Sequence, residues 1–130
     1  MKRTVEMSEL QLAVMRAVWS RGEASTAQVQ EALRDRGLAA TTIATLLSRL
    51  EKRGLLAHRS EGRQFIYRSA VSEQDVTRSM VSDLTRRLFA GDAAALVSHL
   101  INTREFRPGD LERVRILLEA NEKEESRDAD

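Results

Sequence analysis

Short hydroxyl-bearing and small side chains gather on one side of the segment Thr41–Gly54, which reads TTIATLLSRLEKRG. Apolar residues fall on the opposite side at helical spacing, so the segment is expected to be an amphipathic helix. Solvent-facing helix surfaces usually carry long charged residues, and threonine is only a middling helix former. The cluster Thr41, Thr42 and Thr45 therefore indicates a helix that lies close against another surface.

The chemistry open to this helix is hydrogen bonding and apolar contact. Short hydroxyls can reach base edges in the DNA major groove, methyl groups can pack on thymine, and cations can bind phosphate. An ordinary amphipathic helix with a bland polar face is the alternative that this segment alone leaves open. The residues of the helix expected to contact DNA are Thr41, Thr42, Thr45, Ser48, Arg49 and Lys52.

Two helices are predicted before this segment, over residues 8–20 and 25–36. Each begins with the Ser-x-x-Gln spacing of a capping box and ends at a glycine. The only tryptophan, Trp19, is expected in the core, because a large indole at the end of an apolar helix usually packs. The helix over residues 25–36 and the helix Thr41–Gly54 are joined by a few residues, and the latter has the hydroxyl-rich face. Two helices in this arrangement form a helix-turn-helix pattern.

The hydrophobic period changes to about 2 after the helix, which predicts strands over residues 55–59 and 64–68 with a glycine turn between them. A hairpin after the third helix makes a winged helix-turn-helix. Arg59 and Arg63 lie on this wing. Arginines on a hairpin are often simply solvated, but beside a groove-reading helix we expect them to bind phosphate or to probe the minor groove.

Three more helices are predicted in the second half, over residues 72–90, over residues 93–103 and from Pro108 onward. A unit this small buries too little apolar surface to be stable alone. Its apolar stripes could pack against the winged domain, but a second copy of the chain is the favoured partner. The residues expected at this dimer interface are Val76, Met80, Leu84, Leu88, Leu96, Leu100 and Leu117.

The predicted architecture is mainly α with a small β-hairpin, in two domains. A winged-helix DNA-binding domain spans residues 1–70, a helical dimerisation domain spans residues 71–120, and a polar tail covers residues 121–130. The first 70 residues carry 12 Lys and Arg against 7 Asp and Glu, whereas the remaining residues carry 9 against 13. This split, hidden in a net charge of +1, indicates that the first domain faces a polyanion.

Several functional classes find no support in the sequence. The chain has no cysteine, and its two histidines stand far apart, so neither a disulfide nor a metal site is expected. Catalytic triads, paired carboxylates and phosphate loops are absent, so we expect neither an enzyme nor a cofactor. No apolar run could span a membrane and no secretory signal opens the chain, which favours a cytoplasmic protein.

The stretch TTIATLLSRLEKRGLL, followed by GRQFIYRS, resembles the penicillinase-repressor family of the BlaI/MecI/CopY type. The opening LQLAVMRAVW fits the first helix of that family. The resemblance covers residues 7–70 and continues more loosely to about residue 118. It implies a dimeric winged-helix repressor that binds inverted repeats near β-lactamase, methicillin-resistance or copper genes.

Three departures from the family pattern bear on operator contact and on release. Well-known members have basic residues at the places of Thr41 and Ala44, so part of their operator contact is missing here. In antibiotic-responsive members a sensor protease cuts an Asn-Phe bond, and His99-Leu100 stands at the matching place here. The cysteine cluster of copper-responsive members is absent. The end of repression is therefore expected to depend on a regulatory protease of different specificity or on a small-molecule inducer.

Together these features predict a homodimeric transcriptional repressor. It would bind inverted repeats in double-stranded DNA through the helix Thr41–Gly54 and the Arg-bearing wing. The alternative, from another functional class, is a winged-helix module for protein–protein interaction that binds no DNA. The charge split and the hydroxyl-rich face favour the repressor.

Overall fold

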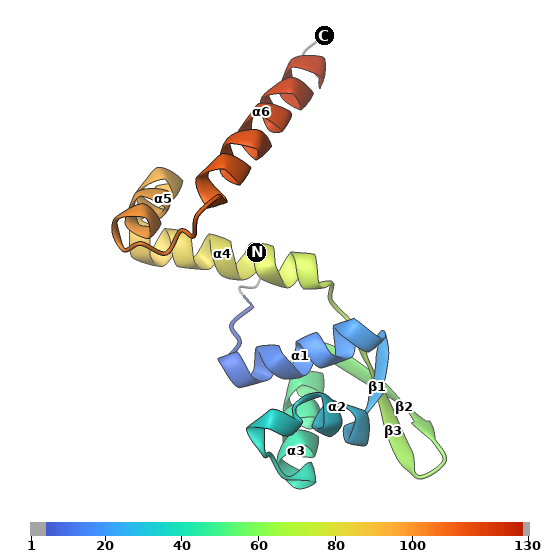
Figure 1. Ribbon diagram of the computed structural model, residues 1–130. Helices are drawn as coiled ribbons and strands as arrows, with labels where there is room; N and C mark the ends of the chain where they lie inside the picture. Colours follow the sequence, from blue (N-terminus) through green and yellow to red (C-terminus); the bar gives the residue numbers. More distant parts are fainter. Residues whose placement is uncertain (1–4, 129–130) are drawn as a thin grey trace. The chain divides into compact units, whose positions relative to one another are not determined.

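The computed structural model describes residues 5–128, and the chain divides into two compact units, residues 1–83 and 84–130. The first unit is a winged helix-turn-helix followed by the start of a long helix (Figure 1). Its elements are α1 (Glu9–Arg21), β1 (Glu23–Ser25), α2 (Thr26–Ala32), the 3-10 helix η1 (Arg34–Arg36), α3 (Ala40–Lys52), β2 (Leu56–Glu61), β3 (Gln64–Ser69) and the first part of α4 (Glu73–Phe89).

Both predicted capping boxes form. Ser8 Oγ accepts a hydrogen bond from the Gln11 backbone N–H at 3.1 Å, and Gln11 Oε1 accepts one from the Ser8 N–H. Ser25 caps α2 in the same way. The second helix is shorter than predicted, because its regular turns end at Ala32 and the chain continues as η1 to Gly37, which has a left-handed φ of 63°.

The wing is part of a three-stranded antiparallel sheet with strand order β1-β3-β2. Sequence analysis predicted the β2–β3 hairpin but missed β1. The missed strand has only three residues, between the end of α1 and the cap of α2, which is too short for a period to be visible. At the hairpin tip Glu61 pairs with Gln64, so the turn is Gly62-Arg63. Gly62 has a φ of +62°, which glycine adopts most readily at the first position of such a turn.

The core lies where α1, α2 and α3 gather on one side of the sheet (Figure 1). Trp19 packs against this core but stays partly exposed, and its Nε1 donates to Ser69 Oγ at 3.0 Å and to the Val71 carbonyl at 3.1 Å. The indole therefore fastens the end of β3 to α1. The fully buried large side chains of the core cluster are Val14, Met15, Val18, Val29, Ile43, Leu47 and Leu50.

The second unit consists of the end of α4, α5 (Ala93–Asn102) and α6 (Asp110–Asp128). Asp92 caps α5, accepting from the Ala95 N–H at 3.1 Å. Two details differ from the prediction. Pro108 precedes α6 instead of lying in its first turn, and the helix runs on through the polar residues 121–128. Within residues 84–128 no side chain is buried, so this unit has no closed core of its own.

None of the helices in the described part of the chain combines the length and apolar character needed to cross a bilayer.

The long helix α4 contributes to both units, since its residues up to Asp83 belong to the first. The Ser72 hydroxyl oxygen accepts a hydrogen bond from the Asp75 N–H at 3.0 Å at the start of this helix. The boundary between the compact units thus falls within α4, after Asp83, whereas the domain boundary predicted from sequence lies near residue 71.

Candidate nucleic-acid interface

Helix α3 has the two-sided character that its sequence predicts. Ile43, Leu47 and Leu50 are buried in the core, which leaves the opposite side of the helix at the surface. Ser48 is only half-buried and lies at the margin between the two sides. The exposed predicted contact residues of this helix are Thr41, Thr42, Thr45, Arg49 and Lys52, and the small residues Ala40 and Ala44 are exposed among them.

The first turn of α3 has no side-chain cap, because its N-cap residue is Ala39. The first backbone N–H groups of a helix have no partner within the helix, and they carry the positive end of its dipole. In α1 and α2 a serine occupies this place. The exposed start of α3 is therefore the end best suited to receive an anionic group.

One hydroxyl on the exposed face is already engaged. Thr45 Oγ1 donates to the Thr41 carbonyl, one turn earlier, at 2.9 Å. A threonine hydroxyl has a single hydrogen to donate but two lone pairs. Toward an outside partner, Thr45 therefore offers an acceptor and a methyl group.

An aromatic cluster joins the wing to the C-terminal half of α3. His58 on β2 stacks on Phe65 of β3 with ring centroids 4.2 Å apart, and its Nδ1 lies 2.6 Å and 2.8 Å from the two carboxylate oxygens of Glu51. Tyr67 lies beside both rings and is buried. Burial, reinforced by the negative charge of Glu51, raises the pKa of Tyr67. These contacts fix the wing relative to α3.

The two wing arginines predicted to bind DNA are in different situations. Arg59 forms ion pairs of 2.8 Å with both Glu23 on β1 and Glu61 on β2. Hydrogen bonds to Glu23 and then Glu61 raise the pKa of Arg59. It would have to leave these carboxylates to reach a phosphate. Arg63 at the hairpin tip is exposed, and within residues 5–128 no group forms a hydrogen bond or ion pair with it.

Two other arginines near α3 also have partners in the protein. Arg36 pairs through both terminal nitrogens with the Glu9 carboxylate, and that hydrogen bonding lowers the pKa of Glu9. Arg53 donates to the Glu6 carbonyl and, at 3.5 Å, to Gln11 Oε1. Both side chains hold the segment around the start of α1.

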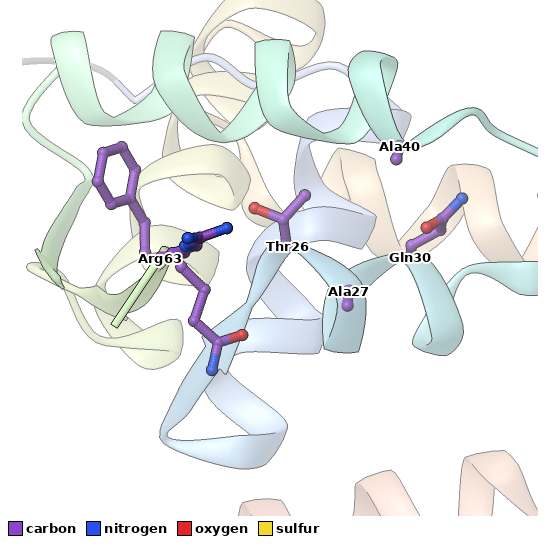
Figure 2. Close-up of a pocket in the computed structure, with 7 residues that line it drawn as sticks. Thr26, Ala27, Gln30, Ala40 and Arg63 are labelled. Carbon is purple, nitrogen blue, oxygen red and sulfur yellow. The ribbon is translucent and has the colours of Figure 1, made fainter. Parts of the chain in front are cut away.

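A surface pocket of about 400 Å³ lies between the start of α3, the start of α2 and the wing tip. Figure 2 shows Arg63 on one side of it, with Thr26, Gln30 and Ala40 around the rest. Phe65 and Gln64 complete its wall on the wing. The pocket brings Arg63 and the uncapped start of α3 to the same depression, a juxtaposition that the sequence did not reveal.

The residues predicted at a dimer interface do not all lie at the surface. Val76 is buried within the chain, which leaves almost none of its surface for a second copy. Leu84, Leu88 and Leu117 are exposed, with 71% of Leu88 accessible. Met80, Leu96 and Leu100 are half-buried. Further large apolar side chains are also exposed in the second unit, namely Val97, Ile101, Leu111, Val114, Ile116 and Leu118.

Among the described residues no group of three or more His, Cys, Asp or Glu side chains could hold a metal ion. The two histidines have other neighbours. His58 belongs to the aromatic cluster on the wing, and His99 meets Phe89 edge to face with centroids 5.7 Å apart.

Comparison with known proteins gives consistent matches over nearly the whole chain. The profile described as Penicillinase repressor matches residues 7–120. The penicillinase repressor of Bacillus licheniformis is 27% identical over 120 residues, which cover 92% of this chain and 94% of that protein. The methicillin resistance regulatory protein MecI of Mammaliicoccus sciuri is 26% identical over 117 residues, covering 89% and 95%.

A solved structure supports the same relationship for part of the chain. The DNA-binding domain of the repressor BlaI, determined in solution, is 36% identical and superposes with a TM-score of 0.50. The superposition covers 58% of this chain and 93% of that domain.

Proposed function

The chain belongs to the penicillinase repressor family, and we propose that it represses transcription as a homodimer bound to an inverted-repeat operator. Members of this family are transcriptional regulators and not enzymes. The relative whose DNA-binding domain has been solved is itself a repressor. Repression by a winged helix-turn-helix requires an element that reads bases and others that hold the DNA backbone.

The observation that carries the proposal is the exposed face of α3. Thr41, Thr42, Ala44 and Thr45 offer short side chains over the first two turns, so the helix backbone can approach another surface closely. A major groove is wide enough for one helix. Long charged side chains would be expected here on a merely solvated helix. We therefore assign base contacts to this face.

Backbone contact is assigned to the pocket beside the wing. Arg63 lines this pocket together with Ala40 at the uncapped start of α3. A guanidinium and a helix N-terminus both favour a phosphate group. Arg59 is assigned a different role, because its bond to Glu23 connects β2 to β1 across the sheet and its bond to Glu61 lies within β2.

The second unit supports the dimer. Its helices leave Leu88, Leu111, Leu117 and Leu118 more than half exposed, and none of its side chains within residues 84–128 is buried. Exposed apolar surface of this extent marks an interaction site in a soluble protein. A second copy would cover it with an equivalent surface, and two-fold pairing matches the symmetry of an inverted repeat.

The assignment of Arg63 is tested by the salt dependence of DNA binding. Duplexes bound by the full chain would first be selected from a random pool, and affinities then measured over a range of salt concentrations. Arg63→Ala should weaken binding to selected and random duplexes alike and lower the log–log salt slope by roughly one. Arg59→Ala should change the slope much less.

Arg16→Ala is the matched control, because Arg16 is an exposed arginine of α1 outside the candidate interface. It removes the same charge and should leave the slope unchanged. Equal slopes for the Arg63 and Arg16 variants would refute the phosphate role. Failure to recover any duplex from the pool would refute the function itself.

A further inference from the structure

We propose that α3 recognises the C5-methyl group of thymine, so that each operator half-site carries an A·T pair opposite Thr45 and Ala44. This inference rests on the proposed function and specifies which bases the exposed face of α3 reads. It arises from the hydrogen bond inside the helix and from the small residues around it.

The Thr45 hydroxyl already donates a hydrogen bond within α3. Its hydrogen is donated to the Thr41 carbonyl at 2.9 Å. The major-groove edge of guanine presents two acceptors, N7 and O6, and so requires a donor. Thr45 has none left to give while this bond holds. It can accept a hydrogen bond or make an apolar contact.

The second step is the setting of Thr45. Ala40 and Ala44 are exposed, as Thr41 and Thr45 are, and none of the four has a long side chain. The methyl groups of Ala40, Ala44 and Thr45 are called the methyl patch below. The nearest charged residue toward the end of the helix is Arg49, one turn further on. An apolar patch pressed against polar base edges would leave those edges without partners, which is costly.

The third step is the base pair that fits. Thymine is the one base with a methyl group in the major groove, and the adenine paired with it presents the N6 donor there. The methyl patch can pack on the thymine methyl group, and the remaining lone pairs of Thr45 can accept a hydrogen bond from adenine N6. An A·T pair thus offers Thr45 both an apolar contact and a hydrogen-bond donor, whereas a G·C pair offers only a donor, the cytosine N4 group.

The test replaces thymine by deoxyuridine, one position at a time, in a duplex selected by the full chain. This change removes only the C5-methyl group and leaves base pairing intact. Binding should weaken about fourfold at one or two positions in each half-site, as expected for one buried methyl, and should be unchanged elsewhere.

The variant Thr45→Ser links the effect to its residue. Serine keeps a hydroxyl that can bond to the Thr41 carbonyl and loses only the methyl. This variant should bind the thymine duplex about fourfold more weakly, and deoxyuridine at the sensitive position should cause no further loss. Thr103→Ser is the matched control, because Thr103 makes the same kind of bond, to the His99 carbonyl at 2.8 Å, in the second unit.

The outcomes separate the inference from the function. If the selected duplex is bound specifically but no deoxyuridine substitution matters, the methyl reading is wrong and the repressor assignment stands. The same holds if Thr45→Ser and deoxyuridine weaken binding independently. If the pool yields no specific duplex, both are wrong.

Discussion

At the scale of single residues, the position of a charged group tells less about its role than its neighbours do. Arg59 and Arg63 are four positions apart on the same wing, and the sequence suggested DNA contact for both. Glu61, two residues from Arg59 on the same strand, was a visible signal of pairing. Glu23 was not, because it is 36 residues away on a strand that the sequence did not reveal.

Tyr67 gives a residue-scale test of the wing core, since it is the only tyrosine in the chain. Burial favours its neutral form and raises the pKa, and Glu51 adds to the effect. Absorbance of the phenolate should therefore give a midpoint above the ordinary value of about 10 for the folded chain. The midpoint should return to that value in denaturant.

The sign of the linked stability change follows from the same shift. Because the pKa is raised on folding, the contribution of the neutral phenol to stability is present below the unfolded pKa and is lost as pH rises through the folded one. A Tyr67 midpoint equal in folded and denatured protein would contradict the burial of its side chain.

At the scale of elements, regular patterns were predictable and short elements were not. The capping boxes, the amphipathic α3 and the hairpin follow from local chemistry, and the structure confirms them. The strand β1 depends on pairing with β3 more than 40 residues later, which no local pattern reveals. Helix α6 continues through residues 121–128, although their polarity suggested a frayed tail.

Helix α5 bears on how repression ends. The bond between His99 and Leu100 stands inside the helix, and the His99 carbonyl accepts from both the N–H and the hydroxyl of Thr103. A protease requires extended backbone, so this bond is protected unless α5 opens locally. Release through a protease of different specificity or a small-molecule inducer stays a prediction.

The apolar stripe of α4 gives an element-scale test of the dimer. Leu88→Asp would place a charge in the proposed interface, where it is costly without a partner. Sedimentation should show monomer, while fluorescence of Trp19 in the first unit should be unchanged. Ser82→Asp, an exposed position on the same helix, should remain dimeric. A dimeric Leu88 variant would mean that the interface lies elsewhere.

At the scale of the whole molecule, the proposed function assigns recognition to one unit and association to the other. Residues 1–83 contain the buried core, the recognition helix and the wing, whereas residues 84–128 have exposed apolar surface and no buried side chain. The inference from the charge split, that residues 1–70 face a polyanion, stays a prediction. Joining two half-site readers makes binding of the second half-site effectively intramolecular, which raises affinity without any new contact.

The most direct measurement compares three duplexes of equal length at one salt concentration. One carries the selected inverted repeat, one has a single half-site scrambled, and one has both scrambled. The proposed repressor should bind the first at least about a thousandfold more tightly than the third, with the second between them. Indistinguishable affinities for all three would contradict sequence-specific binding by the dimer.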